Sequence, residues 1–262
     1  MSTLSITTVE RLIVLFKINP NIVPRIEMLG EGLLPLIVID DYIEDVNGLT
    51  QYITQQAKFS ADGHTQYPGI RSPMIKDIVL AYLKPLMQPI YKIYGFAATQ
   101  TPSPCDNYFS LITTAANDLA DIQTIPHFDT YQPNLIAVIH YLNDKPHGGI
   151  GFFKHKRTGY EFINELRKPE YDQVVNDINL SAASRINGSS INGSSINGSS
   201  IKGYCSVNHR EFECYKTLNY KPNRLIVFPG MLLHSSLVDV TTDIDPNPKT
   251  GRLTANMFVK FL

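Results

Sequence analysis

The strongest chemical signal in the sequence lies at residues 125–129, which are IPHFD. Residues two apart on an extended segment point to the same side, so the side chains of His127 and Asp129 can reach one metal ion. A second pair of the same form, His209 and Glu211, stands in a polar stretch. We take the first pair as the candidate because an apolar run follows it, and we expect the second pair to be solvated.

Another histidine stands in a distant part of the chain. His234 follows a Pro-Gly turn at 229–230 in a segment that is typical of a hairpin. A single histidine in an apolar strand is more often a hydrogen-bonded core residue than a ligand. Together with His127 and Asp129, it makes two histidines and one carboxylate, the facial set of non-haem Fe(II) oxygenases. Zinc hydrolases use the same ligand types, so these residues alone leave the metal open.

The third signal opens the last predicted strand. Arg252 and Thr254 share one face of an extended segment. A guanidinium can bind a carboxylate through two hydrogen bonds, and a neighbouring hydroxyl adds another donor. The pair therefore suits the distal carboxylate of a 2-oxo diacid held near a metal. A salt bridge at a strand edge explains the spacing equally well.

The second part of the chain predicts a β-rich scaffold for these residues. Short apolar and β-branched runs separated by Gly, Pro and Asn are typical of strands. Several such runs in sequence favour a sandwich or jelly roll over a parallel sheet. The predicted strands are residues 108–113, 134–142, 151–155, 224–228, 232–238 and 252–261.

The first part of the chain predicts mixed structure. Residues 34–39 (LPLIVI) indicate a buried strand, and residues 42–57 indicate an amphipathic helix. Apolar residues recur at helical spacing over 75–90. We expect a break in this helix at Pro85 and Pro89, because an interior proline costs about 3 kcal/mol.

We therefore predict one structural unit of the α+β class, with a jelly-roll core and supporting N-terminal helices. The N-terminal α/β support region covers residues 1–96, and the core covers residues 97–262. Three INGSS repeats lie within the core. They predict a flexible surface loop at about 181–203, because Gly, Ser and Asn at this density favour no regular element.

Composition excludes several classes of function. The 262 residues include 23 Lys+Arg and 24 Asp+Glu, with a net charge of -1, so there is no electrostatic basis for nucleic-acid binding. The apolar runs are far shorter than the ~20 residues that span a bilayer, which predicts no membrane partner. Three widely spaced cysteines indicate a reducing, cytoplasmic location.

The motifs, taken in order, resemble those of the 2-oxoglutarate/Fe(II)-dependent oxygenase superfamily, most closely its prolyl-4-hydroxylase-like branch. Within the superfamily the chain is also similar to a bacterial group of uncharacterised proteins that carry the YPGxR, IPHFD, HYL…HGG, NRLIV…LLHS and GRLTAN segments. The superfamily likeness covers residues 97–262, and the closer one extends back to Leu33. The motif residues are His127-Phe128-Asp129, Tyr141-Leu142-Asn143, His147-Gly148-Gly149, Phe152, Pro229-Gly230, His234 and Gly251-Arg252.

This resemblance implies a double-stranded β-helix that binds Fe(II) and uses 2-oxoglutarate as co-substrate. It implies His127, Asp129 and His234 as iron ligands and catalytic residues, and Arg252 and Thr254 as the binding site for the 2-oxoglutarate C5 carboxylate. Arg252 follows His234 by a longer interval than the anchoring base does in many relatives. The implied reaction is a dioxygenase reaction that hydroxylates a substrate and releases succinate and CO2.

The remaining candidate residues are polar or aromatic groups in turns or at strand ends. Tyr108 can add a hydroxyl near 2-oxoglutarate, and Tyr131, Arg157 and Arg71 are candidate substrate contacts. The substrate can be a peptidyl side chain, an amino acid or a small metabolite, and the sequence does not indicate the oligomeric state. Two alternatives stay open: a cupin-like metal enzyme that does not use 2-oxoglutarate, and a non-catalytic jelly-roll binding protein.

Overall fold

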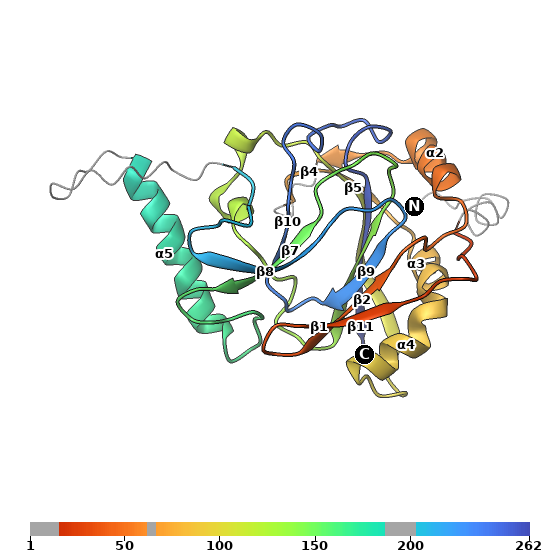
Figure 1. Cartoon of the computed structure of the whole chain (residues 1–262), viewed down its shortest axis with the longest axis horizontal. Coiled ribbons are helices and arrows are strands. Elements are labelled where there is room, and N and C mark those ends of the chain that lie inside the picture. The colour runs from red at the N-terminus through yellow and green to blue at the C-terminus, as the bar shows by residue number, and fades with distance from the viewer. Residues whose placement is uncertain (1–15, 62–66, 187–202) are drawn as a thin grey trace.

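Strands from both halves of the chain join in one antiparallel sheet (Figure 1). The structure is a computed structural model and describes residues 16–61, 67–186 and 203–262. The large sheet consists, in spatial order, of β1 (Arg25–Leu29), β2 (Leu34–Ile39), β9 (Leu225–Pro229), β6 (Leu135–Tyr141), β11 (Thr254–Phe261), β5 (Pro102–Ile112), β4 (Gly69–Pro73) and β3 (Ser60–Ala61). The small sheet consists of β10 (His234–Ser236), β7 (Ile150–His155) and β8 (Phe212–Leu218).

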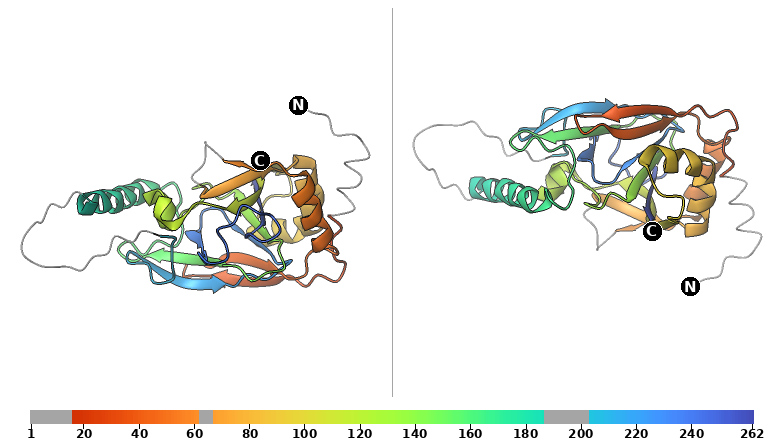
Figure 2. Two further views of the ribbon diagram at one scale, coloured as in Figure 1. Left: turned by 90° about the horizontal axis from the view of Figure 1, so that it is seen from above. Right: turned by 90° about the horizontal axis from the view of Figure 1, so that it is seen from below.

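From β5 onward the chain passes several times between the two sheets, with the consecutive strands β7 and β8 paired in the small one. β5, β6, β9 and β11 lie in the large sheet, whereas β7, β8 and β10 lie in the small one. Between β5 and β6, His127 forms an isolated antiparallel bridge to His234, which places it beside β10. The two sheets share one core cluster, in which Phe152 of β7 packs against Phe228 of β9. The strands therefore enclose an interior between two layers, which Figure 2 shows from above and below.

Helices flank these layers (Figures 1 and 2). On one side lie α2 (Val46–Gln56), α3 (Lys76–Leu83) and α4 (Met87–Tyr94), and on the opposite side lies α5 (Lys168–Ile186). The expected break at Pro85 is confirmed, because a 3-10 turn, η1 (Lys84–Leu86), separates α3 from α4. Pro89 lies in the first turn of α4, where a proline removes no helical hydrogen bond.

The helix predicted at 42–57 begins later than the sequence indicated. Asp45 caps it, because its Oδ1 accepts a hydrogen bond from the Gly48 amide at 2.8 Å. Two short 3-10 turns, η2 (Ala116–Asp118) and η3 (Asp121–Thr124), lead from β5 toward the IPHFD segment. Among the described residues, no helix is long and apolar enough to cross a bilayer.

Several predicted strands are confirmed with small shifts of their ends: 134–142 is β6, 151–155 is β7 and 224–228 is β9. β5 begins earlier than expected, at Pro102, and the strand predicted at 232–238 is reduced to β10. The last strand begins at Thr254. Arg252 therefore lies just before the strand in which it was expected.

The N-terminal region does more than pack on the core. The strand predicted at 34–39 is confirmed as β2, and it pairs with β9 through Ile37 and Val227. Three further strands, β1, β3 and β4, extend the same sheet at its two edges, and the sequence analysis did not identify them. Helix α5 continues to Ile186, past the expected loop start at 181, and the INGSS repeats lie outside the described residues.

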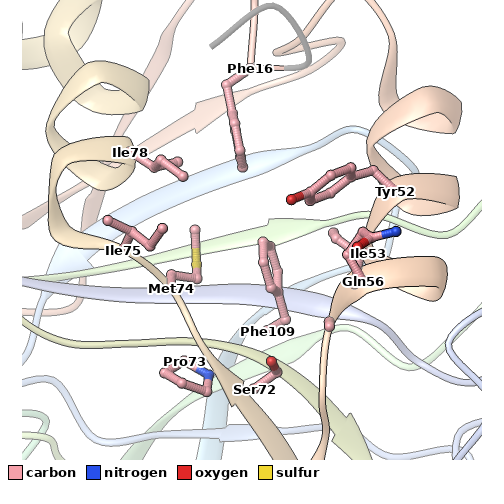
Figure 3. Close-up of a pocket in the computed structure, with 11 residues that line it drawn as sticks. Phe16, Tyr52, Ile53, Gln56, Ser72, Pro73, Met74, Ile75, Ile78 and Phe109 are labelled. Carbon is pink, nitrogen blue, oxygen red and sulfur yellow. The ribbon is translucent and has the colours of Figure 1, made fainter. Parts of the chain in front are cut away.

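Alternation along the central strands separates two faces of the large sheet. Ala255 and Phe109 are directly paired and belong to the core that α2, α3 and α4 cover. A pocket of about 230 Å³ lies on this helix-covered side, and Figure 3 shows Ser72 and Phe109 among its lining residues. Because successive side chains point to opposite faces, Arg71 and Ser110 face the interior between the sheets instead.

A buried polar network ties α3 to the sheet. The hydroxyl of Tyr82 is hydrogen-bonded to Nδ1 of His140 on β6, and Nε2 of His140 lies 3.0 Å from Oδ1 of Asn223. Asn223 also bonds both backbone groups of Ile43, at 3.0 and 2.8 Å. Every polar ring atom of this fully buried histidine is thus occupied. Burial lowers the pKa of His140 to about 4, so it is neutral in the folded protein.

This network predicts an acid-dependent loss of stability. Below pH 6.5 the unfolded chain binds a proton at residue 140 that the folded chain binds only near pH 4. Protons therefore favour unfolding in this window, by about 1.4 kcal/mol per pH unit for each such group. In urea unfolding with chelator, His140→Gln will be less stable than wild type at neutral pH but will lose less free energy on mild acidification. Equal losses in the two proteins would contradict the assignment.

Candidate metal centre

Two backbone hydrogen bonds join His127 to His234. The amide of His127 donates to the carbonyl of His234 at 2.9 Å, and the amide of His234 donates to the carbonyl of His127 at 2.8 Å. The amide of Asp129 donates to the carbonyl of Gly230 at 2.7 Å, which holds the same segment against the turn before β10. Because residues 127 and 129 point to one side, the three side chains converge, with His234 buried, Asp129 mostly buried and His127 partly open to solvent.

The possible ligand atoms of these side chains converge. One nitrogen of each histidine and one oxygen of Asp129 lie within 4.8 Å of one another. Nε2 of His127 lies 3.9 Å from Oδ1 of Asp129, and Nε2 of His234 lies 3.8 Å from Oδ2. Nδ1 of His234 donates to the carbonyl of Leu232 at 2.8 Å, so its Nε2 carries the lone pair that faces the carboxylate.

The electrostatics of the triad fit a bound cation. Oδ2 of Asp129 is buried and makes no hydrogen bond, and burial raises the pKa of Asp129 to about 6. Burial lowers the pKa of His234 to about 4. Desolvation by its neighbours and nearness to His234 lower the pKa of His127, although 55% of its side-chain surface remains exposed. A carboxylate that lacks a partner beside two neutral imidazoles is costly to bury. A divalent metal ion offsets this cost and suits this set of nitrogen and oxygen donors.

The pair His209 and Glu211 shows how context separates two similar motifs. The expectation that this pair is solvated is wrong for His209, which is buried. Its Nδ1 accepts a hydrogen bond from the amide of Glu211 at 3.2 Å, and its ring packs against Phe212. Within the described ranges, the triad of His127, Asp129 and His234 is the one group of three such residues that converges.

Arg252 is buried at the opposite wall of the interior, 3% exposed. Its Nε donates to the carbonyl of Gly148 at 2.8 Å, and one terminal nitrogen donates to the carbonyl of Gly149 at 3.2 Å. The guanidinium carbon lies 5.4 Å from the centre of the Tyr141 ring. The structure thus holds Arg252 against the Gly-Gly turn before β7.

A buried carboxylate that the sequence analysis did not identify stabilises this turn. Asp243 accepts hydrogen bonds from Nδ1 of His147 at 2.9 Å and from the Gly148 amide at 3.0 Å, and its Oδ2 lies 3.9 Å from Nε of Arg252. Burial raises the pKa of Asp243, but these partners outweigh it and the pKa is lowered overall. Residue 148 must be glycine, because a Cβ there would lie 1.7 Å from the carbonyl oxygen of Leu237.

Asp243 explains the long interval between His234 and Arg252. The residues between them place the Asp243 carboxylate beside His147 and Arg252. The unusual length of this interval was the only sequence signal for it.

Residues of four adjacent strands form one row on the interior face. Arg71 of β4 is paired with Ser110 of β5, which is paired with Thr254 of β11, and Thr254 is paired with Tyr141 of β6. The hydroxyl of Tyr141 is buried, and burial raises its pKa while the neighbouring guanidinium of Arg252 lowers it. Tyr141 is therefore a candidate binding residue that the sequence analysis had quoted only as part of a motif.

The other candidate residues of the sequence analysis lie in three different surroundings. The guanidinium of Arg71 lies over Tyr67 and Tyr108, 4.1 and 5.0 Å from the two ring centres. Tyr131 is 37% exposed, two positions after Asp129. Arg157 forms an exposed ion pair with Asp177 of α5 at 3.2 Å, so its described interactions are with the helix and not with the triad.

The chain shows a family relationship over nearly its whole length. A model of a family of unknown function, DUF6445, matches residues 20–259. The chain belongs to this family. No curated protein matches it significantly.

Among solved structures, the chain is similar to HygX from Streptomyces hygroscopicus with nickel and 2-oxoglutarate bound. The TM-score is 0.42 at 10% identity, over 86% of this chain and 82% of that one. It is also similar to AviO1 from Streptomyces viridochromogenes Tue57, with a TM-score of 0.39 at 11% identity over 99% and 96% of the two chains. At this low identity the function of the family member depends on the chemistry of its own residues.

The triad predicts metal binding that depends on Asp129. Asp129→Asn removes the only charged donor, so Mn(II) affinity measured by calorimetry will fall about 100-fold or more, beyond the 10–100-fold typical of changes around a metal's ligands. Glu211→Gln, in the similar motif, is the matched control and will bind Mn(II) as wild type does.

In chelator, Asp129→Asn will also raise the free energy of unfolding by about 1 to 3 kcal/mol, because a buried carboxylate without a hydrogen bond is replaced by a neutral amide. Equal loss of Mn(II) affinity in both variants, or a fall in metal-free stability for Asp129→Asn, would contradict the site.

Proposed function

We propose that this protein is an Fe(II)- and 2-oxoglutarate-dependent dioxygenase that hydroxylates its substrate and releases succinate and CO2. The observation that carries the proposal is the convergence of His127, Asp129 and His234 in an interior whose opposite wall holds Arg252 and Thr254. Two histidines and one carboxylate hold a metal and leave positions open. A buried arginine and a hydroxyl suit the distal carboxylate of 2-oxoglutarate.

The order of the strands supports the same conclusion. The chain passes back and forth between two facing sheets. This path gives the order β9–β6–β11–β5 in the large sheet and the order β8–β7–β10–His127 in the small one. We infer that this winding is a double-stranded β-helix, to which the N-terminal region adds strands at both ends of the large sheet. We further infer that the support region at 1–96 and the core at 97–262 form one unit.

The residues of the chain have distinct tasks in this reaction. His127, Asp129 and His234 would hold the metal. Iron(II) bound there supplies the activation of O2, which is coupled to decarboxylation of 2-oxoglutarate and to oxidation of the substrate. Leu232 fixes the orientation of the His234 ring through Nδ1, so that Nε2 is available without a change of tautomer.

The co-substrate end of the interior is preorganised by the chain. The carbonyls of Gly148 and Gly149 orient the guanidinium of Arg252, and the hydroxyls of Thr254 and Tyr141 flank it on neighbouring strands. These groups bind the C5 carboxylate and thereby aim the 2-oxo end at the metal. Tyr108 lies on β5 two residues before Ser110, the partner of Thr254, and therefore on the same face of the sheet. It adds a further hydroxyl.

Apolar residues pack against the His234 side of the site, whereas the His127 side chain is 55% exposed. The ring of Phe228 lies 4.8 Å from the ring of His234 and packs edge-on against Phe152 at 5.3 Å. Exclusion of water prevents wasteful side reactions of the oxidising centre.

The three cysteines are free, in keeping with the reducing cytoplasm in which we place this chemistry.

One observation favours a second candidate. Arg252 already donates to two carbonyls and lies near Asp243, so its role can be to support the turn. In that case the protein is a cupin-like metal enzyme that does not use 2-oxoglutarate. The following experiment separates these functions.

Anaerobic titration of the Fe(II) protein with 2-oxoglutarate will produce the weak visible charge-transfer band of the chelate. Arg252→Ala will keep Fe(II) but bind 2-oxoglutarate at least about tenfold more weakly, because hydrogen bonds to a charged group are lost. Arg252→Lys will be intermediate, since it keeps the charge without the planar fork. His234→Ala will lose the metal and the band.

The matched control is Arg25→Gln, which changes an exposed arginine on β1 that pairs with Glu27. It will bind both ligands as wild type does. A folded, Fe(II)-loaded wild type that gives no band under anaerobic conditions, and no succinate after O2 is admitted with 2-oxoglutarate present, would refute the proposed function and favour the cupin-like candidate.

A further inference from the structure

The pocket on the helix-covered side of the large sheet is separate from the candidate metal centre. It has a volume of about 230 Å³ and lies between α2, the start of α3, and the strands β4 and β5, as Figure 3 shows. Ser72 and Phe109, which line it, are paired across these two strands. Successive side chains of a strand point to opposite faces, so Ser110 faces away from the pocket. The sheet therefore separates a molecule in this pocket from the row that contains Ser110 and Thr254.

The wall of the pocket is apolar and largely aromatic. Phe16, Met74 and Phe109 are buried in it, and Figure 3 shows their side chains around one space. Aromatic rings and a methionine sulfur pack well against a flat aromatic molecule. None of the 11 residues that line the pocket, all within the described ranges, carries a charge. An ionised group would be buried here without a counter-charge, which is costly, so the pocket suits an uncharged molecule.

The volume limits the size of the occupant. An apolar cavity of about 150 Å³ holds benzene, and scaling from its six carbons to the larger pocket gives a body of about nine or ten non-hydrogen atoms. Two fused aromatic rings have this size. Gln56 and Ile75 are exposed at the rim, which gives such a molecule a path from solvent.

Two hydroxyl groups of the pocket are available to a ligand. Ser72 is only 6% exposed and Tyr52 is half-buried, and neither hydroxyl is hydrogen-bonded within the part of the chain that the structure describes. Figure 3 shows the Tyr52 hydroxyl pointing into the space between the helices. By contrast, the hydroxyls of Tyr42 and Tyr82 in the same core are bonded. Buried polar groups normally have partners, so the two free hydroxyls indicate where a polar group of the occupant binds.

We propose that this pocket binds an uncharged aromatic molecule of about two fused rings that carries one hydroxyl or carbonyl group. The rings of Phe16 and Phe109 hold its body, and the hydroxyls of Ser72 and Tyr52 bind its polar group. The pocket is a binding site and not a catalytic one, because it shares no residue with the metal centre. The inference does not rest on the proposed function.

The test uses 2-naphthol as the probe with metal-free, full-length protein. Equilibrium dialysis measures its binding through the fluorescence of the free compound, and the chain has no tryptophan that would contribute emission. We expect saturable binding of 2-naphthol by wild type. The anion 2-naphthoate will bind at least about tenfold more weakly, because its charge finds no partner in the pocket.

Variants locate the probe. The double variant Ser72→Ala, Tyr52→Phe removes both hydroxyls with little change of shape. It will bind 2-naphthol about two- to tenfold more weakly, since neutral hydrogen bonds are lost, but will bind naphthalene at least as tightly as wild type does. Tyr131→Phe, which removes an exposed hydroxyl outside the pocket, is the matched control and will bind 2-naphthol as wild type does. Saturating Mn(II) with 2-oxoglutarate will leave the affinity for 2-naphthol unchanged.

Four results would overturn the proposal. They are no saturable binding of 2-naphthol by wild type, equal affinity of wild type and the double variant, 2-naphthoate binding as tight as that of 2-naphthol, and loss of 2-naphthol binding when Mn(II) and 2-oxoglutarate are added. The last result would place the probe at the metal centre. Failure of the proposed function is distinguishable, because the dialysis experiment uses metal-free protein and reads the pocket directly.

Discussion

The pair of backbone hydrogen bonds between His127 and His234 is the contact on which the candidate site depends. It joins a segment between β5 and β6 to a strand near the end of the chain. Each histidine donates and accepts through its main chain, so the bridge fixes both Cα positions without using either ring. The rings and the Asp129 carboxylate then remain available for a ligand. Register at this one bridge decides whether the three donors meet, because a shift by one residue would turn each side chain to the other face.

A second buried assembly holds the opposite wall in place. Asp243 accepts hydrogen bonds from His147 and the Gly148 amide, and Arg252 donates to the carbonyls of Gly148 and Gly149. Buried charges persist when they are paired and hydrogen-bonded, and here each supports the same turn. The wall is therefore preorganised by contacts within the chain, whereas the triad leaves a carboxylate oxygen without a partner. This contrast is typical of a scaffold that concentrates its unsatisfied groups where a ligand binds.

The N-terminal region lengthens the large sheet at both ends. By adding β3 and β4 beside β5, it brings Arg71 into the row that contains Thr254. By adding β1 and β2 beside β9, it extends the opposite end of the large sheet. The core supplies the metal ligands and the buried arginine, and the added strands supply the second positive charge.

The sequence by itself determined the local features. The direction in which successive side chains point along a strand or helix depends on neighbours in the chain. The sequence therefore predicted β6, β7 and β9, the break at Pro85, and the shared face of His127 and Asp129. Only the tertiary structure decided which distant groups meet. His209 and Glu211 have the same spacing as the triad pair, yet His209 is buried and bonded within its own loop. Asp243 and the strand β1 carried no distinctive local pattern, and Tyr141 and the β4 segment were noted only as parts of family motifs. Their positions follow from strand register and sheet order, which are set by long-range packing of the whole chain.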